Sequence, residues 1–492
     1  MSEAELHQNR MRLHQGERQK AARGELRLPL RNARRATLGR SGATILRPGR
    51  QAGELPGGKT PVITARCQDN YASKKDIPYS DNVRRLRYSC AEFVCGILVQ
   101  LENDCAANTW ADMSSFLQDP VDSDAILADI RSIVEIESPS RNVAGVNRVL
   151  EAIARFFEGT GAVCERQQTT PTLGDILRVR CDPTRNEPGV LLLSHMDTVH
   201  PVGTLAGKLA YRREGDRIYG PGIYDMKGGL VLAVAAFRRI AHARRRTPLP
   251  ITFLFTPDEE LSSPATRSVI EREAAGHRYV LVTEPARDGG KIVTARKGVG
   301  AFVIRTRGWP AHAGGNPDKG RNAILAMAEI TLAIEGLNDR TRGITTNVGL
   351  IEGGTARNTV AEDCTIEVDL RFCDRASASE MEAKILALKS SRPDIEITVI
   401  GKITRPPFAR DRGVDLMFER AAAIAREIGF ALESAPLVGG GSDGNFTVEM
   451  GIPTLDGLGV DGDGAHTNHE HLLFSSIEPR TRLLQGLMER LE

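Results

Sequence analysis

The chain has 492 residues, of which 41% are hydrophobic and 26% charged, as in an ordinary globular protein. A formal net charge of +2 gives no reason to expect a nucleic-acid partner for the whole chain, and no run of about 18 apolar residues indicates a membrane-spanning helix. The eight cysteines include no Cys-x-x-Cys pair, so a metal site would need histidines and carboxylates rather than thiolates.

Residues 1–112 differ from the remainder of the chain. The segment 10–50 is rich in Arg, Gly and Gln and lacks hydrophobic periodicity, which is typical of a disordered arm. Three interpretations stay open: an interaction tail, an Arg-rich targeting peptide, or a start codon assigned too far upstream. The sequence that opens at Met113 favours the third. A signal peptide is not expected, because the apolar stretch 90–101 is short and contains Glu92.

The first predicted elements after this extension are helices. Apolar residues recur at helical spacing in 124–136, where Ser123 or Asp124 is the expected N-cap, and again in 146–157. Residues 161–182 alternate enough to form one or two strands.

An apolar run of Val190 and three leucines, which stops at Ser194, predicts a strand at 189–194 that is buried on both faces of a sheet. His195 and Asp197 follow it, and side chains at positions i and i+2 of an extended segment point to the same side. Open α/β sheets bind their ligands at the carboxyl ends of their strands. Taken alone, the pair fits either a metal site or a hydrogen-bonded pair in a loop.

Acidic residues occupy equivalent places farther along the chain. Asp225 precedes the predicted helix 230–240, Glu259 and Glu260 follow strand 251–256, and Glu284 follows strand 279–283. Helix capping at Asp225 and a solvated loop at Glu259 are the structural alternatives. Adjacent carboxylates repel each other unless a cation neutralises them. Their recurrence at strand ends therefore predicts one cluster around a metal.

The order of the predicted elements changes after residue 296. Strand 299–305, a long helix, strands 346–352 and 364–372, helix 377–390 and strand 395–399 follow in that order. This order predicts a ferredoxin-like domain that interrupts the main domain. A helix through 421–428, a short apolar segment at 452–455 and a final amphipathic helix complete the chain.

The motifs together resemble the zinc amidohydrolase family that contains glutamate carboxypeptidase, aminoacylase, acetylornithine deacetylase and succinyl-diaminopimelate desuccinylase. The matching segments are SHMDTVHP, YGPGIYDMKGG, TPDEELSSPATR, TEP, RKG, GWPAHAGGNPDKGRNAI, GGTARNTVAEDC, VDLR, GGGSDGNF and GAHTNHEHL. They occur in the family's order and cover residues 115–490.

The resemblance implies an α/β fold in which a catalytic domain with a mixed sheet is interrupted by a smaller ferredoxin-like α+β dimerisation (lid) domain. The expected parts are an N-terminal extension at 1–112, the first part of the catalytic domain at 113–295, the ferredoxin-like domain at 296–408 and the second part of the catalytic domain at 409–492.

The resemblance also implies two Zn2+ ions per subunit, for which Co2+ can substitute. His195 and Glu284 would hold one ion, His466 and Glu260 the other, and Asp225 would bridge both. The family further implies a cis peptide bond between Asp225 and Met226. His469 and His471 lie so near His466 that spacing does not exclude them as ligands.

The remaining site residues follow from the same resemblance. Asp197 would orient the histidine ligand, and Glu259 would be the general base that takes a proton from a metal-bridging water and passes it to the leaving nitrogen. His312 resembles a histidine that a partner subunit contributes to stabilise the oxyanion. The residues expected to hold a substrate carboxylate are Arg371, Asn358, Gly440, Gly441 and, by a looser match, Arg405.

The leading hypothesis is a glutamate carboxypeptidase-like metallopeptidase that hydrolyses an amide and releases an amino acid. The alternative enzyme is an N-acyl-amino-acid deacylase of the acetylornithine deacetylase or succinyl-diaminopimelate desuccinylase type. An alternative of another class is a metal-free binding or assembly protein on the same fold. A third possibility, nucleic-acid binding through the basic arm, predicts steeply salt-dependent binding.

Partners and location complete the expectations. The substrate would be a small molecule or peptide with a free carboxylate, and the chain would form a homodimer through the ferredoxin-like domain. A cytoplasmic protein without a nucleic-acid or membrane partner is expected.

Overall fold

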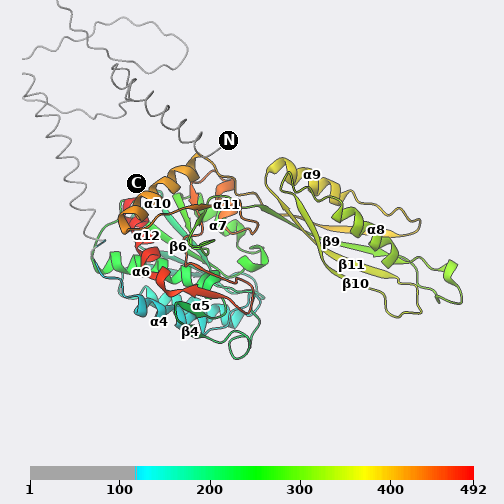
Figure 1. Ribbon diagram of the computed structural model, residues 1–492, viewed down its shortest axis with the longest axis horizontal. Coiled ribbons are helices and arrows are strands. Elements are labelled where there is room, and N and C mark those ends of the chain that lie inside the picture. Colours follow the sequence, from blue (N-terminus) through cyan, green and yellow to red (C-terminus); the bar gives the residue numbers. More distant parts are fainter. Residues whose placement is uncertain (1–116, 118) are drawn as a thin grey trace, which may run out of the picture. The chain divides into compact units, whose positions relative to one another are not determined.

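The computed structural model describes residue 117 and residues 119–492 (Figure 1). The predictions for 1–112 and for a start at Met113 therefore lie outside the described residues. All of these described residues belong to one unit of the chain. None of the helices within 119–492 combines the length and apolar character that crossing a membrane requires.

The larger sheet has six strands in the order β1-β2-β6-β3-β7-β14. The strands are β1 (Val163–Gln167), β2 (Ile176–Arg180), β3 (Gly189–His195), β6 (Ile251–Thr256), β7 (His277–Val282) and β14 (Thr454–Leu455). Strands β6, β3, β7 and β14 run parallel, whereas β1 and β2 are antiparallel to their neighbours. The predicted mixed sheet and its central buried strand are confirmed.

Helices cover both faces of this sheet, which explains why β3 is apolar throughout. Along β3, Leu192 packs into one core and Leu191 and Leu193 into another. Burying each such leucine contributes roughly 1.5–3 kcal/mol relative to leaving it exposed. One face carries α4 (Ser123–Val134), α5 (Val143–Phe156), α6 (Gly228–His242), α10 (Arg412–Ile428) and α12 (Ile477–Arg490), and the other carries α7 (Arg267–Ala274) and α11 (Gly444–Glu449).

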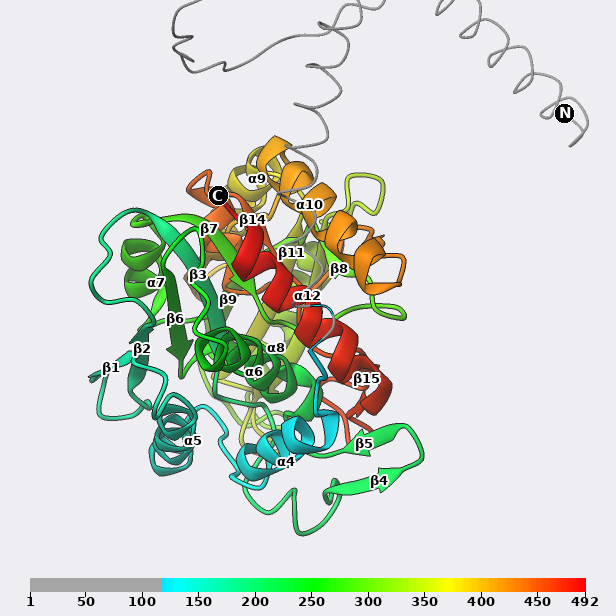
Figure 2. The same cartoon turned by 90° about the vertical axis from the view of Figure 1, so that its left-hand side faces the viewer.

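Helix α6 is apolar nearly all round because it is buried between the sheet and α12, and Figure 2 shows the two helices side by side. Its first turn needs glycine. A Cβ added at Gly229 would lie 2.0 Å from the carbonyl oxygen of Thr283, at the end of β7. This close approach places the start of α6 against the segment that carries Glu284.

The N-cap of α4 differs from the prediction. Asp122, rather than Ser123 or Asp124, caps the helix, and its side chain accepts a hydrogen bond from the N–H of Ala125 at 2.9 Å. Asp124 lies in the first turn instead, where its negative charge faces the positive end of the helix.

The smaller sheet has four strands in the order β10-β11-β9-β12, all antiparallel. Its elements are β9 (Gly298–Arg307), α8 (Ala323–Glu335), β10 (Thr345–Gly353), β11 (Asp363–Phe372), α9 (Arg375–Leu386) and β12 (Glu396–Arg405). This chain order and pairing confirm the predicted ferredoxin-like topology, although β12 extends to Arg405 rather than ending at residue 399. The domain boundaries at 113, 296 and 409 stay predictions.

The core of the smaller sheet lies on one face. Along β9, Phe302 and Ile304 are buried while Ala301 and Arg305 are exposed, and both helices pack on the buried face (Figure 1). The two ends of the segment that forms the smaller sheet lie side by side. The main-chain N–H of Arg296 donates to the carbonyl oxygen of Phe408, and that of Phe408 donates to the carbonyl oxygen of Arg296, both at 3.0 Å.

Several short strands escaped the sequence prediction. The strands β4 (Arg212–Glu214), β5 (Arg217–Tyr219), β15 (Gly462–Asp463) and β16 (His471–Leu473) form a second four-stranded sheet, and β8 (Ile292–Val293) pairs with β13 (Ser434–Ala435). The pairing of His471 with Tyr219 brings the loop after β15 next to the loop after β5.

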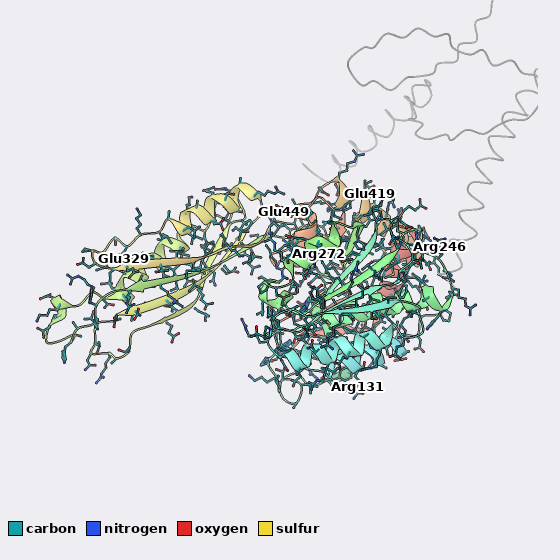
Figure 3. All side chains as sticks on the ribbon, turned by 180° about the vertical axis from the view of Figure 1, so that it is seen from behind. Arg131, Arg246, Arg272, Glu329, Glu419 and Glu449 are labelled. Atoms are coloured by element: carbon teal, nitrogen blue, oxygen red, sulfur yellow. The ribbon has the colours of Figure 1, made fainter. Side chains whose placement is uncertain are left out.

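Charged side chains on the surface contrast with those of the interior. Arg131, Arg246 and Glu419 are exposed, as labelled in Figure 3. Exposed charges of this kind are ordinary. Buried charges need partners, and His195, Asp197 and Glu284 are buried at or just beyond the carboxyl ends of the central strands.

Candidate metal centre

The carboxyl ends of β6, β3 and β7 lie side by side and supply most of the centre. His195 is the last residue of β3, Glu259 and Glu260 lie in a short 3-10 helix (η2, Glu259–Leu261) after β6, and Glu284 follows β7. Ligand atoms of His195, Asp225 and Glu260 lie within 4.8 Å of one another, and so do those of His195, Glu259 and Glu284. The structure thus gathers these strand-end residues in one place.

Asp225 stands between two histidines. Its Oδ1 lies 3.3 Å from Nε2 of His195 and its Oδ2 lies 3.5 Å from Nε2 of His466. The residue belongs to a π turn (η1, Ile223–Lys227) before α6, and the Asp225–Met226 peptide is cis, as the resemblance implied. Each carboxylate oxygen thus faces a different imidazole, which is the arrangement of a bridging ligand.

His466 is the histidine of its loop that faces the cluster. Its Nε2 lies 3.2 Å from Oε2 of Glu260, although its side chain is 54% exposed. Nδ1 of His471 donates to the carbonyl oxygen of His469 at 2.9 Å, and the ring of His471 lies against Tyr219. The two tightest groups of possible ligands in residues 119–492 include no histidine of this loop, so the contacts of His466 with Asp225 and Glu260 are what place it at the cluster.

Glu284 and Glu259 lie on the other side of His195. Oε1 of Glu284 is 3.7 Å from Nε2 of His195, and its Oε2 is 3.9 Å from the buried guanidinium of Arg296. Oε1 of Glu259 accepts a hydrogen bond from Nη2 of Arg405 at 2.9 Å. Glu259 is therefore close enough to be a ligand, but an arginine already holds one of its oxygens.

Asp197 meets His195 through two oxygens. Its main-chain carbonyl oxygen accepts the hydrogen bond from Nδ1 of His195 at 2.9 Å, and its carboxylate Oδ1 lies 3.4 Å from the same nitrogen. The carboxylate accepts from Ser140 Oγ at 2.6 Å and from the N–H groups of Glu259 and Glu260 at 3.2 Å each. Asp197 therefore fixes the histidine tautomer that leaves Nε2 free for a metal, and it ties β3 to the turn after β6.

The pKa values of two glutamates and both histidines of the cluster are raised, but from different causes. Burial, with the nearby charge of Asp225, raises the pKa of Glu284 to about 8, and burial also raises that of Glu260. Hydrogen bonds to Asp225 and Glu260 raise the pKa of His466 to about 11. Burial opposes protonation of His195, yet its carboxylate partners raise its pKa well above the ordinary value. The cluster therefore strongly favours positive charge at its centre.

The donor set fits divalent cations. Among the described residues, Oε1 of Glu260 is a buried oxygen without any hydrogen-bond partner. Leaving such a group unsatisfied is costly, and coordination to a cation would satisfy it. Imidazole nitrogens and carboxylate oxygens are ligands that suit zinc. His195, Asp225 and Glu284 would hold one ion and His466, Asp225 and Glu260 a second.

Besides Arg405, three of the predicted site residues belong to the segment that forms the smaller sheet. Nδ1 of His312 accepts hydrogen bonds from the N–H groups of Gly314 at 3.2 Å and Gly315 at 2.9 Å, so the ring proton resides on Nε2. Nε of Arg371 donates to Asp369 at 2.8 Å, and Asn358 is exposed. Within 119–492 no hydrogen bond or ion pair joins His312, Arg371 or Asn358 to the metal cluster, so their substrate roles stay predictions.

Arg405 lies beside Glu259 and next to Gly441, whereas the carbonyl oxygen of Gly440 accepts from Nη1 of Arg296 at 3.2 Å. Arg405 is 2% exposed, and besides Glu259 it donates to Asp443 Oδ1 at 2.9 Å and Ser263 Oγ at 3.0 Å. A Cβ added at Gly441 would lie 2.7 Å from Cδ of Arg405. The guanidinium predicted to hold a substrate carboxylate is thus engaged by protein groups, and that substrate role stays a prediction.

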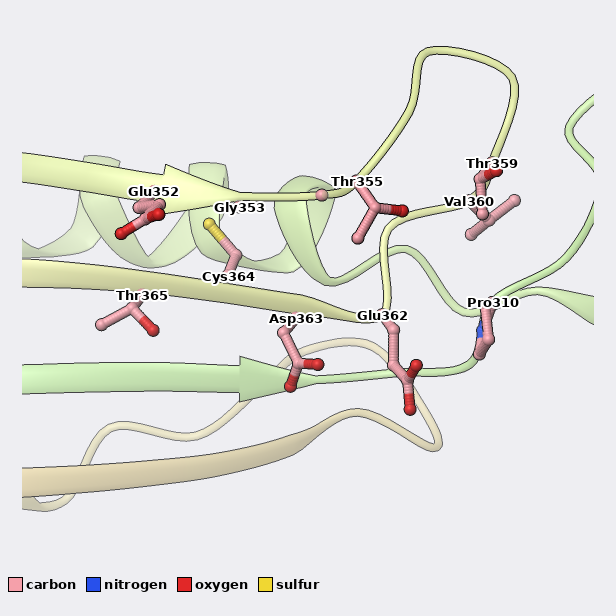
Figure 4. A pocket seen from close by; sticks show the side chains of 11 residues that line it. Pro310, Glu352, Gly353, Thr355, Thr359, Val360, Glu362, Asp363, Cys364 and Thr365 are labelled. Carbon is pink, nitrogen blue, oxygen red and sulfur yellow. The ribbon is translucent and has the colours of Figure 1, made fainter.

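A surface cavity of about 280 Å3 lies in the smaller sheet, beside the loop between β10 and β11 (Figure 4). Glu352, Glu362 and Asp363 are among its lining residues, and no candidate metal ligand is. The cavity is therefore separate from the metal centre.

Two residues that support the centre were not predicted from the sequence. Glu470 accepts main-chain hydrogen bonds in the Asp225 loop, and Arg296 forms a two-bond ion pair with Asp456 beside Glu284. The only signal for Glu470 was its place four residues after His466, and Arg296 stood in the RKG motif without an assigned role.

Comparisons with known proteins agree with this geometry. Residues 191–490, more than half of the chain, match the peptidase family M20/M25/M40. Carboxypeptidase G2 of Pseudomonas sp. (strain RS-16) is 28% identical over 362 residues, covering 72% of this chain and 86% of that protein. Succinyl-diaminopimelate desuccinylase of Xylella fastidiosa is 27% identical over 360 residues, covering 69% and 92%.

Solved structures share the fold. An aminopeptidase from Bacillus cereus matches with a TM-score of 0.59 at 23% identity, covering 75% of this chain and 98% of that one. An M20 family metallo-carboxypeptidase from Sulfolobus solfataricus matches with a TM-score of 0.58 at 17% identity, covering 74% and 98%.

Proposed function

Because the chain belongs to peptidase family M20/M25/M40, whose members are metallopeptidases and amidohydrolases, we propose that it is a dizinc enzyme that cleaves an amide bond and releases an amino acid. The observation that carries the proposal is the position of Asp225, with one carboxylate oxygen facing His195 and the other facing His466. The partnerless buried oxygen of Glu260 supports it independently.

The chemistry divides between the metal and the protein. When bound, zinc supplies Lewis acidity that polarises the scissile carbonyl and acidifies water. Glu259 is the base: it takes the proton from water and delivers it to the leaving nitrogen. Arg405 donates to Oε1 of Glu259, and no hydrogen bond described within 119–492 engages Oε2, which is therefore the oxygen that moves the proton.

The substrate proposed is an amide that ends in glutamate. The similarity to carboxypeptidase G2 and the glutamate at the Glu284 position support this choice. Arg371 and Asn358, with the glycine N–H groups at Gly440 and Gly441, would hold the substrate carboxylate. Arg405 would bind the substrate carboxylate only if the substrate displaced Glu259, Asp443 or Ser263 from its guanidinium. His312 would donate from Nε2 to the oxyanion.

A second candidate is hydrolysis of an N-acyl amino acid. The succinyl-diaminopimelate desuccinylase of Xylella fastidiosa is nearly as similar, and 92% of its length is covered. Both reactions would use the same metal ligands and base, so the carboxylate-binding residues would decide between them.

We propose a homodimer in the cytoplasm, with Co2+ able to replace zinc. Exposed apolar side chains on α8 and β10 support the pairing of two copies: Leu332 is 74% exposed, Leu350 63% and Ile351 60%. Large exposed apolar patches commonly mark protein interfaces.

The test is release of free amino acid by the zinc-loaded full-length chain. The panel pairs folate-type and acyl-peptide substrates ending in glutamate with N-acetyl and N-succinyl amino acids. Turnover restricted to glutamate amides is expected, whereas preference for simple acyl amino acids would identify a deacylase with the same centre. Two zinc ions bound without any turnover would contradict the substrate class, and no zinc bound would contradict the proposal itself.

A further inference from the structure

Glu470 is a buried carboxylate whose hydrogen bonds converge on the loop of Asp225. It is 1% exposed. Its Oε1 accepts from the N–H groups of Tyr224 at 2.9 Å and Asp225 at 3.0 Å, and its Oε2 accepts from that of Gly222 at 3.0 Å. The side chain of Glu470 thus accepts from three main-chain N–H groups, one of which belongs to the bridging residue itself.

The same carboxylate reaches the loop of a second ligand. Nε2 of His200 lies 2.5 Å from Oε2 of Glu470, and both side chains are buried. His200 stands five residues after His195, in the segment that leaves β3. An anchored His200 therefore restrains the segment that carries His195.

Glu470 itself belongs to the loop of a third ligand. It follows His466 by four residues, and the next residue, His471, opens β16 and pairs with Tyr219 of β5. The carbonyl oxygen of Glu470 also accepts from the N–H of Gly220 at 3.4 Å. One residue therefore joins the segment that follows His195 to the loops that carry Asp225 and His466.

We propose that Glu470 is a positioning residue that sets the spacing of the two metal sites before any metal binds. The inference rests on the proposed function. Glu470 is not a ligand in this account, because four donors already occupy both of its oxygens. Outer partners of this kind change metal affinity by about 10- to 100-fold when they are altered.

Glu137 offers a matched control. Its carboxylate also accepts main-chain hydrogen bonds, from Gly203 at 2.9 and 2.8 Å and from Leu205 at 2.8 Å. The loop that it holds contains none of the proposed metal ligands. Glu137→Gln therefore tests loss of a similar loop anchor away from the metal sites.

The experiment measures zinc affinity and stoichiometry in full-length wild type, Glu470→Gln, His200→Gln and Glu137→Gln, by competition with a chromophoric chelator. A glutamine at position 470 places an NH2 group opposite at least one of the groups that now donate to Glu470. It therefore removes at least one of these hydrogen bonds with little change in side-chain size. His200→Gln keeps the three N–H contacts and serves if Glu470→Gln does not fold. Circular dichroism of the metal-free chains verifies the fold.

We expect Glu470→Gln to weaken zinc binding by about 10- to 100-fold, His200→Gln to weaken it less, and Glu137→Gln to leave it unchanged. Equal zinc affinity in a folded Glu470→Gln variant and wild type would overturn the inference while leaving the proposed function intact. If Glu470→Gln does not fold, unchanged affinity in His200→Gln would overturn it. A wild-type chain that binds no zinc would overturn both.

Discussion

Nη2 of Arg405 donates a hydrogen bond to Oε1 of Glu259 at 2.9 Å, across 146 residues of sequence. The arginine is the last residue of β12 in the smaller sheet, and the glutamate follows β6 of the larger one. Burial raises the pKa of Glu259 well above its ordinary value, and the charge of Arg405 opposes that rise. A residue of the inserted segment thus sets the environment of the proposed base.

Glu259→Gln should lower kcat by about 10²- to 10⁴-fold, because the glutamine cannot accept the proton from water. Zinc content should stay at the wild-type level, since the proposed ligands are untouched. Amino-acid release and metal analysis on the same preparation measure both. Wild-type turnover in this variant would rule out Glu259 as the base.

Arg405→Lys should reduce kcat by roughly tenfold or more with little change in KM. A lysine keeps the charge but cannot serve Glu259, Asp443 and Ser263 at once. Steady-state kinetics on a glutamate amide separate the two parameters. A raised KM with wild-type kcat would instead favour the role predicted from the sequence, contact with the substrate carboxylate.

His466→Ala should bind one zinc ion fewer than wild type, because it removes a ligand of only one of the two proposed sites. His469→Ala is the control, since His469 is exposed in the same loop and no ion pair described within 119–492 joins it to Asp225 or Glu260. Metal analysis after equilibrium dialysis gives the stoichiometry. Loss of zinc from the His469 variant instead would show that the wrong histidine has been assigned.

Zinc affinity should rise with pH. In the metal-free chain the pKa of His466 is raised to about 11, so at neutral pH zinc must displace a proton, and affinity should increase about tenfold per pH unit for each proton displaced. The same shift stabilises the metal-free fold fully below the ordinary value of 6.5, and this contribution is lost as pH rises toward 11. Chelator competition at several pH values measures the slope, and a flat profile would contradict the proposed ligand.

His312→Gln should lower kcat without loss of zinc, because His312 would act on the oxyanion and not on the metal. If His312 acts across a dimer, mixing inactive His312→Gln and Glu259→Gln chains should restore about a quarter of wild-type activity, since half of the dimers then hold one complete site. Subunit exchange followed by an activity assay tests this. No recovery in verified mixed dimers would place His312 in its own subunit's site.

The sequence predicted the parts of the centre that depend on local pattern. The apolar run of β3 and the positions of His195, Asp225, Glu260 and Glu284 at strand and helix ends were enough to expect a cluster, and the structure gathers these residues. The family resemblance, rather than spacing, singled out His466 from its neighbours, and the structure turns that side chain toward Asp225.

What the sequence did not predict depends on distant pairs and on main-chain atoms. The partners of Glu470 lie 245 to 248 residues away in the Asp225 loop, so no local pattern could connect them. The bond from His195 to the carbonyl oxygen of Asp197 involves a main-chain atom that every residue carries, so the sequence pointed only to the carboxylate, which lies 3.4 Å from the same ring nitrogen. Strands of two or three residues, such as β15 and β16, are too short for alternation to reveal.

The paired main chains of Arg296 and Phe408 have a consequence for how such enzymes diversify. The two ends of the segment 297–407 lie next to each other, so a homologous segment could replace it without changing the path of the remaining chain. Such a replacement would exchange His312, Asn358 and Arg371, whereas the proposed zinc ligands lie outside the segment and would be kept. Substrate specificity would then change independently of the hydrolytic chemistry, provided that each new segment kept an arginine at the position of Arg405, where it contacts Glu259.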